Sequence, residues 1–160
     1  MINSTSFTLK MQQNQPTIQQ LKELSSQLPE KLPYLKMLIL FGSRATGETH
    51  DDSDWDFATL YDPNLRQSHI ADNAFKGFEV PLILDQIFGI NSDIIDVVEL
   101  NTCPWLLAHF IARDGILIYE KDAGGFEYFR LTSLRSESEL KQFRQDQRQL
   151  IDMELQKWGV

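Results

Sequence analysis

The chain has 160 residues, of which 42% are hydrophobic and 24% are charged, and its formal net charge at pH 7 is −8. This length and composition are typical of one globular domain. The acidic balance argues against a dedicated DNA- or RNA-binding protein, because phosphate backbones are bound by clustered Lys and Arg. The single cysteine, Cys103, excludes an intramolecular disulfide and fits a reducing cytoplasm.

No apolar run is long enough to cross a membrane. We therefore expect a cytoplasmic protein with no membrane contact and no direct DNA binding. The expected organisation is a single domain over residues 1–160, with a polar N-terminal tail over 1–15 and a helical C-terminal segment over 122–160.

The first predicted elements are a helix and a buried strand. Four apolar residues at near-helical spacing indicate the helix, and Pro29 and Pro33 are expected to end it. The four are Ile18, Leu21, Leu24 and Leu28. The continuous apolar run over 35–41 predicts a strand that is buried on both faces.

The pair Gly42-Ser43 follows this strand directly. We expect a short helix from Ser43 to Gly47 and then a polar loop over 48–53. Backbone N–H groups at a helix start are free to bind an anion, and a glycine lets the backbone approach phosphates closely. Arg44 is a candidate partner for a triphosphate. Its alternative role is a surface ion pair with an acidic residue of the polar loop.

A second strand is predicted over 55–61, and two acids lie at its start. Asp54 and Asp56 are two residues apart, so they project to the same face, while Trp55 projects into the core. Adjacent carboxylates repel each other unless a cation lies between them. Hard ions such as Mg²⁺ prefer carboxylate and phosphate oxygens. The stretch therefore predicts a phosphate-binding turn followed by a metal site.

The middle of the chain predicts four further elements after a polar connection over 64–73. They are an amphipathic helix over 78–89 that begins near Pro81, a strand over 94–100, a helix over 104–113 capped by Asn101 or Thr102, and a strand over 116–119. Asp96 is an acid within the apolar third strand and needs a partner there. A salt bridge or a position on an edge strand would satisfy this need without any further role.

The C-terminal segment begins with a capping box, Ser136-x-x-Glu139. Its apolar stripe consists of Leu140, Phe143, Leu150, Ile151, Leu155 and Trp158. A parallel basic stripe consists of Lys141, Arg144 and Arg148. We expect the apolar stripe to pack on the core, and the alternative is a surface for a partner. The basic stripe is expected to be a solvated face.

The spacing of these residues resembles a known family. Gly42-Ser43, ten residues and Asp54-x-Asp56 match the signature of the DNA polymerase beta-like nucleotidyltransferase superfamily. The short chain and the run Gly42 to Gly47 resemble its minimal nucleotidyltransferase branch, which includes MntA-like antitoxins of the HEPN/MNT toxin–antitoxin systems. The implied fold is α+β of the α/β type: a small mixed sheet flanked by helices, with one or more C-terminal helices.

The resemblance also implies an activity. Asp54, Asp56 and Asp96 would bind two Mg²⁺ ions about 3.5–4 Å apart, and Gly42, Ser43 and Arg44 would bind ATP. AMP would pass from ATP to a tyrosine of a HEPN-type RNase toxin, in a hetero-oligomer with that toxin, releasing pyrophosphate and neutralising the toxin.

Two alternatives are a non-catalytic antitoxin that acts by binding alone and a small-molecule nucleotidyltransferase of the aminoglycoside type. The intact acids argue against the first, because a protein that only binds needs no converging carboxylates. The small size argues against the second, because it leaves no second domain to hold an antibiotic.

Overall fold

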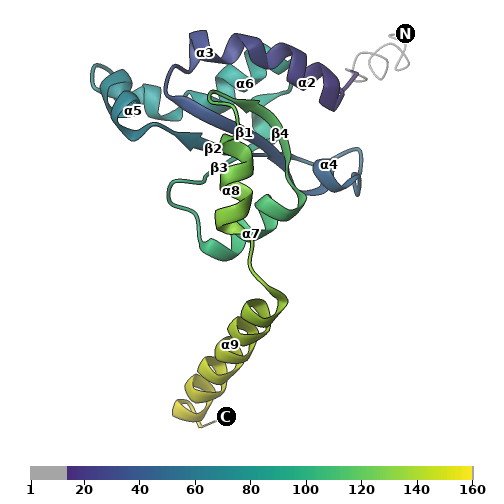
Figure 1. Ribbon diagram of the computed structural model, residues 1–160, viewed down its shortest axis with the longest axis vertical. Helices are drawn as coiled ribbons and strands as arrows, with labels where there is room; N and C mark the ends of the chain where they lie inside the picture. Colours follow the sequence, from purple (N-terminus) through teal and green to yellow (C-terminus); the bar gives the residue numbers. More distant parts are fainter. Residues whose placement is uncertain (1–13, 160) are drawn as a thin grey trace, which may run out of the picture.

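A four-stranded mixed sheet forms the centre of the protein (Figure 1). The computed structural model describes residues 14–159, so most of the predicted N-terminal tail lies outside the described residues. The strands lie in the order β3-β2-β1-β4. Their bounds are β1 Leu35–Phe41, β2 Trp55–Tyr61, β3 Ile95–Glu99 and β4 Ile116–Glu120. β1 is antiparallel to β2 and β4, and β2 is parallel to β3.

The first two strands have the predicted bounds, and the third is shorter than predicted. Its first expected residue, Ile94, belongs instead to the 3-10 turn η3, Ser92–Ile94. Asn91 begins this turn, because its side chain accepts a hydrogen bond from the N–H of Asp93. Such Asx turns compete with strand geometry. β4 continues one residue beyond the predicted end, to Glu120.

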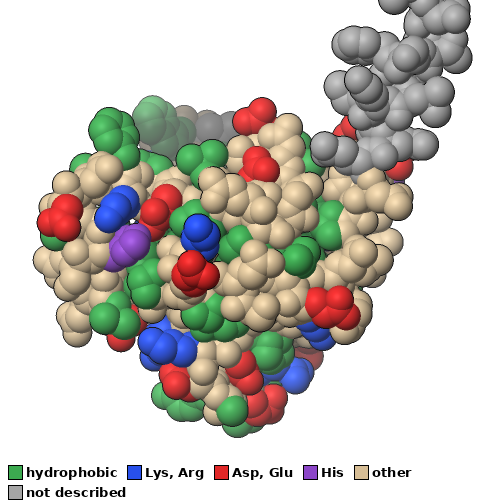
Figure 2. All heavy atoms as spheres, turned by 90° about the horizontal axis from the view of Figure 1, so that it is seen from above, with side chains coloured by type: hydrophobic (Ala, Val, Ile, Leu, Met, Phe, Trp, Pro, Cys, Tyr) green, Lys and Arg blue, Asp and Glu red, His purple; other side chains and the backbone are tan. Residues whose placement is uncertain are grey.

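One face of the sheet is covered by α2 (Ile18–Leu24), η1 (Ser25–Gln27), α3 (Leu28–Lys31) and α6 (Val80–Phe88). Their apolar side chains join those of the strands in the main core, where Leu21, Leu40, Phe57 and Leu84 are fully buried. Figure 2 looks down on this end of the molecule and shows hydrophobic, acidic and basic side chains interspersed over its surface. The buried side of these helices therefore carries the apolar pattern.

Pro29 was expected to end the first helix and does not. It lies in the first turn of α3, where a missing backbone N–H leaves no hydrogen bond unmade. The chain leaves the helical conformation at Leu32, next to Pro33, as predicted.

The predicted helix over 78–89 is shorter than expected, and one of its expected core residues faces solvent. Pro81 lies in its first turn as predicted, and Gly89 ends it in the left-handed conformation with φ 68°. Leu82 is 57% exposed and does not join the core.

The polar connection after β2 is more ordered than its sequence indicates. It contains α5, Pro63–Ile70, and η2, Ala74–Phe78. The side chain of Asp62 caps α5 by accepting hydrogen bonds from two backbone N–H groups. Asp62-Pro63 is therefore a local helix-start signal at the beginning of this connection.

The other face of the sheet is covered only in part, by α7 (Trp105–Asp114) and α8 (Gly125–Ser133). Ile111 of α7 packs with Ile39 and Ala58 of the sheet. Neither predicted cap begins α7: its N-cap is Pro104, without a side-chain hydrogen bond. Asn101 instead bonds the backbone of Tyr61 at the end of β2, with its amide acting as both donor and acceptor. This bond fastens the loop after β3 to the neighbouring strand.

The last helix, α9 (Glu137–Lys157), begins with the predicted capping box at Ser136 and Glu139. It projects away from the sheet and its helices (Figure 1). Leu140 is its one buried residue. The expectation that its whole apolar stripe packs on the core is therefore wrong beyond the first turns. Within residues 14–159, no helix has the length and apolar character of a membrane span.

Candidate active site

The site begins where β1 turns into the short helix α4 (Ser43–Thr46). Gly42 precedes this helix with φ 71° and ψ −157°, a conformation open only to glycine. Gly47 ends the helix at φ 84°. The predicted turn over Ser43 to Gly47 is therefore formed. The N–H groups of Ser43 and Arg44 begin the helix, where such groups have no intrahelical acceptor.

Asp56 lies directly beside this turn. In the pairing of β1 with β2 it is the partner of Phe41, the residue before Gly42. A Cβ atom on Gly42 would collide with the Asp56 carboxylate oxygen Oδ2. The glycine is thus required by the carboxylate as well as by its own backbone angles. The turn at Gly42 and the carboxylate of Asp56 are therefore immediate neighbours.

Asp96 lies next to Asp56 across the sheet. The parallel register of β2 and β3 pairs these two residues directly, and paired residues of neighbouring strands point to the same face. Asp54, just before β2, projects to that face as well. It is the face that α7 and α8 partly cover, because Ala58, two residues further along β2, belongs to their cluster.

The pKa of Asp56 depends on the charges of the other two acids. Partial burial raises the pKa of Asp56, and the negative charges of Asp96 and Asp54 raise it further. Arg44 acts in the opposite direction on the same pKa. Asp96 is exposed, not enclosed by the apolar strand as expected. Its neighbour across the strand pairing is Asp56, and a cation between the two carboxylates would relieve their repulsion.

Arg44 is directed at the polar loop and β2. Its Nε donates to the carbonyl oxygens of Ser53 and Asp54, each at 3.2 Å. Its guanidinium carbon lies 4.2 Å from the centre of the Trp55 ring. The expected alternative, an ion pair with a loop acid, is not formed among the described residues. The neighbourhood of Ser53 and Trp55 was not anticipated from the sequence, which gives no signal for a contact to backbone oxygens.

The site fits magnesium when part of the coordination comes from a substrate. Among the described residues, no group of three or more His, Cys, Asp or Glu side chains is placed so that it could hold a metal ion. Mg²⁺ is commonly bound by one or two carboxylates together with phosphate oxygens. Asp56 and Asp96 supply carboxylates of this kind. Partial burial, and after it the charges of Asp96 and Asp54, raise the pKa of Asp56, and a cation beside these carboxylates would relieve the repulsion among them.

Two other side chains of chemically reactive types, His109 and Cys103, are buried or partly buried in the fold. His109 is 3% exposed, and its Nδ1 accepts a hydrogen bond from the N–H of Arg135. Cys103 is half-buried, and burial raises the pKa of its thiol, which disfavours the nucleophilic thiolate. Neither residue belongs to the acidic site.

The comparisons with known proteins agree with this geometry. The family model "Polymerase beta, Nucleotidyltransferase" matches residues 19–124, a range that contains the turn and all three acids. The chain belongs to this nucleotidyltransferase family.

One curated relative is the protein adenylyltransferase MntA of Aphanizomenon flos-aquae. This chain is 50% identical to it over 150 residues, which are 94% of this chain and 100% of the relative. The match includes both the sheet domain and most of the C-terminal segment.

Among solved structures, a mutant of the toxin–antitoxin MntA-HpeT aligns with a TM-score of 0.52 at 21% identity, over 89% of this chain and 99% of that chain. A toxin–antitoxin with AMP-PNP aligns with a TM-score of 0.49 at 20% identity, over 88% of this chain and 99% of that chain. The first of these matches supports the fold.

Proposed function

We propose that the protein is an antitoxin that transfers AMP from ATP to a tyrosine hydroxyl of a HEPN-type RNase toxin and thereby neutralises it. The observation that carries the proposal is the pairing of Asp56 with Asp96 beside the Gly42-Ser43 turn, in a chain that is 50% identical to a protein adenylyltransferase. ATP is the substrate that an adenylyltransferase requires.

The reaction divides among the residues of the site. The N–H groups after Gly42 and the Ser43 hydroxyl bind the β- and γ-phosphates, because they open a helix beside the acids. Asp54, Asp56 and Asp96 would hold the two magnesium ions that this reaction requires. When bound, these ions neutralise the charge that develops on the attacking and leaving oxygens. The tyrosine oxygen forms the new bond to the α-phosphorus, and the bond to the bridging oxygen breaks to release pyrophosphate.

Asp96 is the residue that we assign to the acceptor hydroxyl. Of the two paired acids, Asp96 is the more accessible to an incoming substrate, because it lies on the edge strand β3 while Asp56 lies on the inner strand β2. Its carboxylate accepts the tyrosine proton as the new bond forms. An exposed acid suits an acceptor as large as a protein side chain.

The proposal is tested with labelled ATP, Mg²⁺ and the cognate HEPN toxin. We expect label on the toxin and loss of its RNase activity. Asp56→Asn should abolish both, while Asp52→Asn, a matched change in the exposed polar loop, should leave them intact.

Three other outcomes would contradict the proposal. Neutralisation without label that survives Asp56→Asn would make the protein an antitoxin that acts by binding. Label on an added aminoglycoside in place of the toxin would make it an antibiotic-modifying enzyme. No label on either would remove the transferase role.

A further inference from the structure

The apolar stripe of α9 has no covering within the described part of the chain beyond the first turns. Leu150, Ile151, Leu155 and Trp158 are exposed to 54%, 58%, 45% and 80%. At about 100° per residue these four lie on the same face of the helix as Leu140 and Phe143. They line an apolar surface together with Glu154. The stripe therefore has a covered end and an open end, which the polar residues 144–149 separate.

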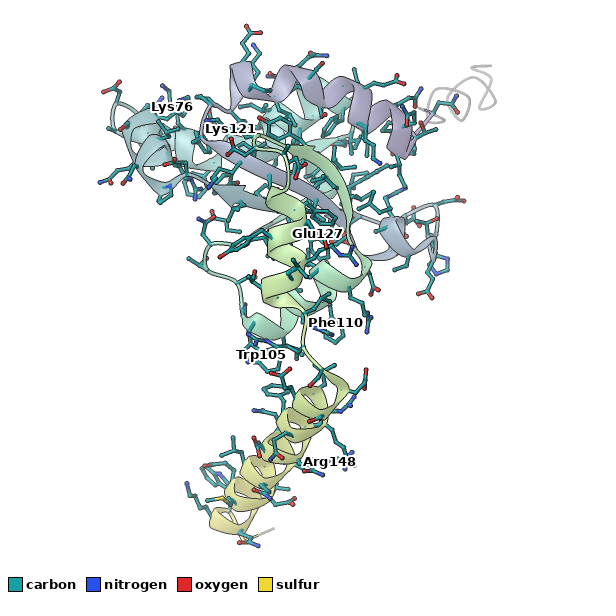
Figure 3. The ribbon with its side chains drawn as sticks, viewed as in Figure 1. Lys76, Trp105, Phe110, Lys121, Glu127 and Arg148 are labelled. Carbon is teal, nitrogen blue, oxygen red and sulfur yellow. The ribbon has the colours of Figure 1, made fainter. Side chains whose placement is uncertain are left out.

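The covered end is fixed to the sheet domain. Leu140 is buried, and the ring of Phe143 makes an edge-on contact with Trp105 of α7, with 5.0 Å between ring centres. The N–H of Arg135 donates to His109 just before the helix. Figure 3 shows Trp105 and Phe110 at the end of the domain that faces α9. These contacts give the open end a defined direction.

The direction of α9 relates it to the active site. The helix is attached to α7 and follows α8, the two helices on the face to which the acids project. In Figure 1 α9 leaves from this side, opposite to α2 and α3. A protein that lies along α9 is therefore on the catalytic side of the sheet.

The charged residues of α9 indicate the chemistry of a partner that would bind the stripe. Lys141 and Arg144 lie beside the covered end and the polar stretch after it, and Arg148 borders the open end, which also carries Asp152 and Glu154. None of the three basic residues forms an ion pair within residues 14–159, whereas Glu154 is paired with Lys157. A partner helix with an apolar face and acidic residues along its edge would satisfy both the stripe and these basic residues. A second copy of this chain is the other candidate for the surface, and the experiment below distinguishes it from the toxin.

We propose that the open half of α9 is the docking surface for the toxin, and that it binds an amphipathic, acidic-edged helix of that protein. This rests on the proposed function, whose protein substrate it concerns. Docking on α9 is separate from the acids, so affinity for the toxin and AMP transfer are carried by different parts of the chain.

The test is a charge placed on the stripe. Ile151→Glu with Leu155→Glu should weaken toxin binding by about tenfold or more, because two anchors of the interface become charged. The matched control, Gln149→Glu with Gln156→Glu, adds the same charge to the opposite face and should bind normally. Both variants should keep the wild-type melting temperature, because all four positions are exposed.

The outcomes separate this inference from the proposed function. A stripe variant that binds the toxin as tightly as the wild type overturns the docking surface, whether or not AMP is transferred. A wild-type dimer in solution that the stripe variant dissociates, with toxin affinity unchanged, assigns the surface to a second copy and also overturns it. Toxin binding that depends on the stripe, without label from wild-type protein, leaves docking intact and removes only the transferase.

A second inference concerns Arg44, whose contacts are independent of α9. Its Nε donates to the carbonyl oxygens of Ser53 and Asp54, and its guanidinium lies over Trp55. These contacts join the helix α4 to the chain on both sides of Asp54. We infer that Arg44 is a positioning residue that holds Asp54 beside Asp56, in place of the triphosphate contact expected from the sequence.

Replacement of Arg44 by Lys and by Met distinguishes the two roles. A positioning role predicts a fall of kcat by about tenfold or more with little change of KM for ATP in both variants, because Lys lacks the planar group that bonds two carbonyls and stacks on Trp55. The Mg²⁺ concentration for half-maximal activity should rise. A raised KM for ATP that Lys largely restores would overturn the inference and return Arg44 to the triphosphate.

Discussion

The helices of the sheet domain and α9 have similar amphipathic patterns, but their apolar faces differ in burial. In the domain, α2 and α6 bury most of their apolar residues against the strands, with Leu82 of α6 as an exposed exception. In α9, Leu140 is buried while Leu155 on the same face is 45% exposed. An apolar stripe on a helix predicts that another surface packs against it. The stripe does not indicate whether that surface belongs to the same chain or to a partner. The difference separates residues that hold the fold from residues left for a partner.

The largest effect that tests the domain side of this comparison is expected from Gly42→Ala. The new Cβ would meet the Asp56 carboxylate at a positive φ, so the acid must move. We expect AMP transfer to fall by more than about a hundredfold, because a displacement near 1 Å of a catalytic group has that cost. Rates with labelled ATP and toxin provide the measurement.

Gly47→Ala is the control for this substitution. Gly47 also has a positive φ, 84°, but an added Cβ meets nothing within 4 Å. Its cost should be backbone strain of about 1–2 kcal/mol in the free energy of unfolding, with transfer largely retained. Equal loss of activity in both variants would mean that Gly42 serves only the turn.

A direct test of the comparison uses two leucines of α9. Leu140→Ala removes a buried side chain and should lower the free energy of unfolding by about 2–5 kcal/mol. Leu155→Ala should change it by less than about 0.5 kcal/mol in the isolated protein. Denaturant unfolding gives both values. If Leu155→Ala were as costly as Leu140→Ala, the end of α9 would be covered by the chain itself.

The pH dependence of stability should show the repulsion between the acids. Because the folded-state pKa of Asp56 is raised, the folded protein binds this proton more tightly than the unfolded chain. Its contribution therefore favours folding while Asp56 is protonated, and it is lost as the pH rises from the ordinary aspartate range through the raised pKa.

Asp56→Asn should remove this contribution and melt at a temperature equal to or slightly above that of the wild type at neutral pH. Melting curves across this pH range, with and without Mg²⁺, measure the effect. A sharp fall in the melting temperature of the variant would instead give Asp56 a structural role.

The smallest effect is expected from Ser43→Ala. The loss of one hydroxyl donor to a phosphate should weaken ATP affinity by up to about tenfold, with little change in the Mg²⁺ requirement. Titration with a non-hydrolysable ATP analogue measures the affinity. An unchanged affinity would limit phosphate binding to the backbone N–H groups.

Much of the fold was predictable because the strongest signals are local. Apolar runs ended by Gly42 and Asp62 gave the bounds of β1 and β2, and the Ser136–Glu139 box gave the start of α9. The proximity of Asp56 and Asp96 was accessible only through the family resemblance, since forty residues of chain separate them and register is a tertiary property. The roles of single acids stay predictions.

Other features could not be read from the pattern. Leu82 and the outer half of α9 carry apolar residues at helical spacing, yet within residues 14–159 these side chains are largely exposed. Arg44 donates to backbone carbonyl oxygens. Every residue has such an oxygen, so the sequence does not indicate which ones Arg44 contacts. The cap of α5 at Asp62 was the one missed feature with a recognisable local signal.

The parallel alignment of β2 and β3 has an evolutionary consequence. The segment between these strands crosses from one end of the sheet to the other through α5 and α6, and its length has no bearing on which residues are level. Insertions and deletions there are compatible with catalysis provided that the strands keep their alignment. A shift of β3 by one position would turn Asp96 to the opposite side of the sheet. Natural variants should therefore tolerate changes in the length of this crossover far better than insertions or deletions within β3.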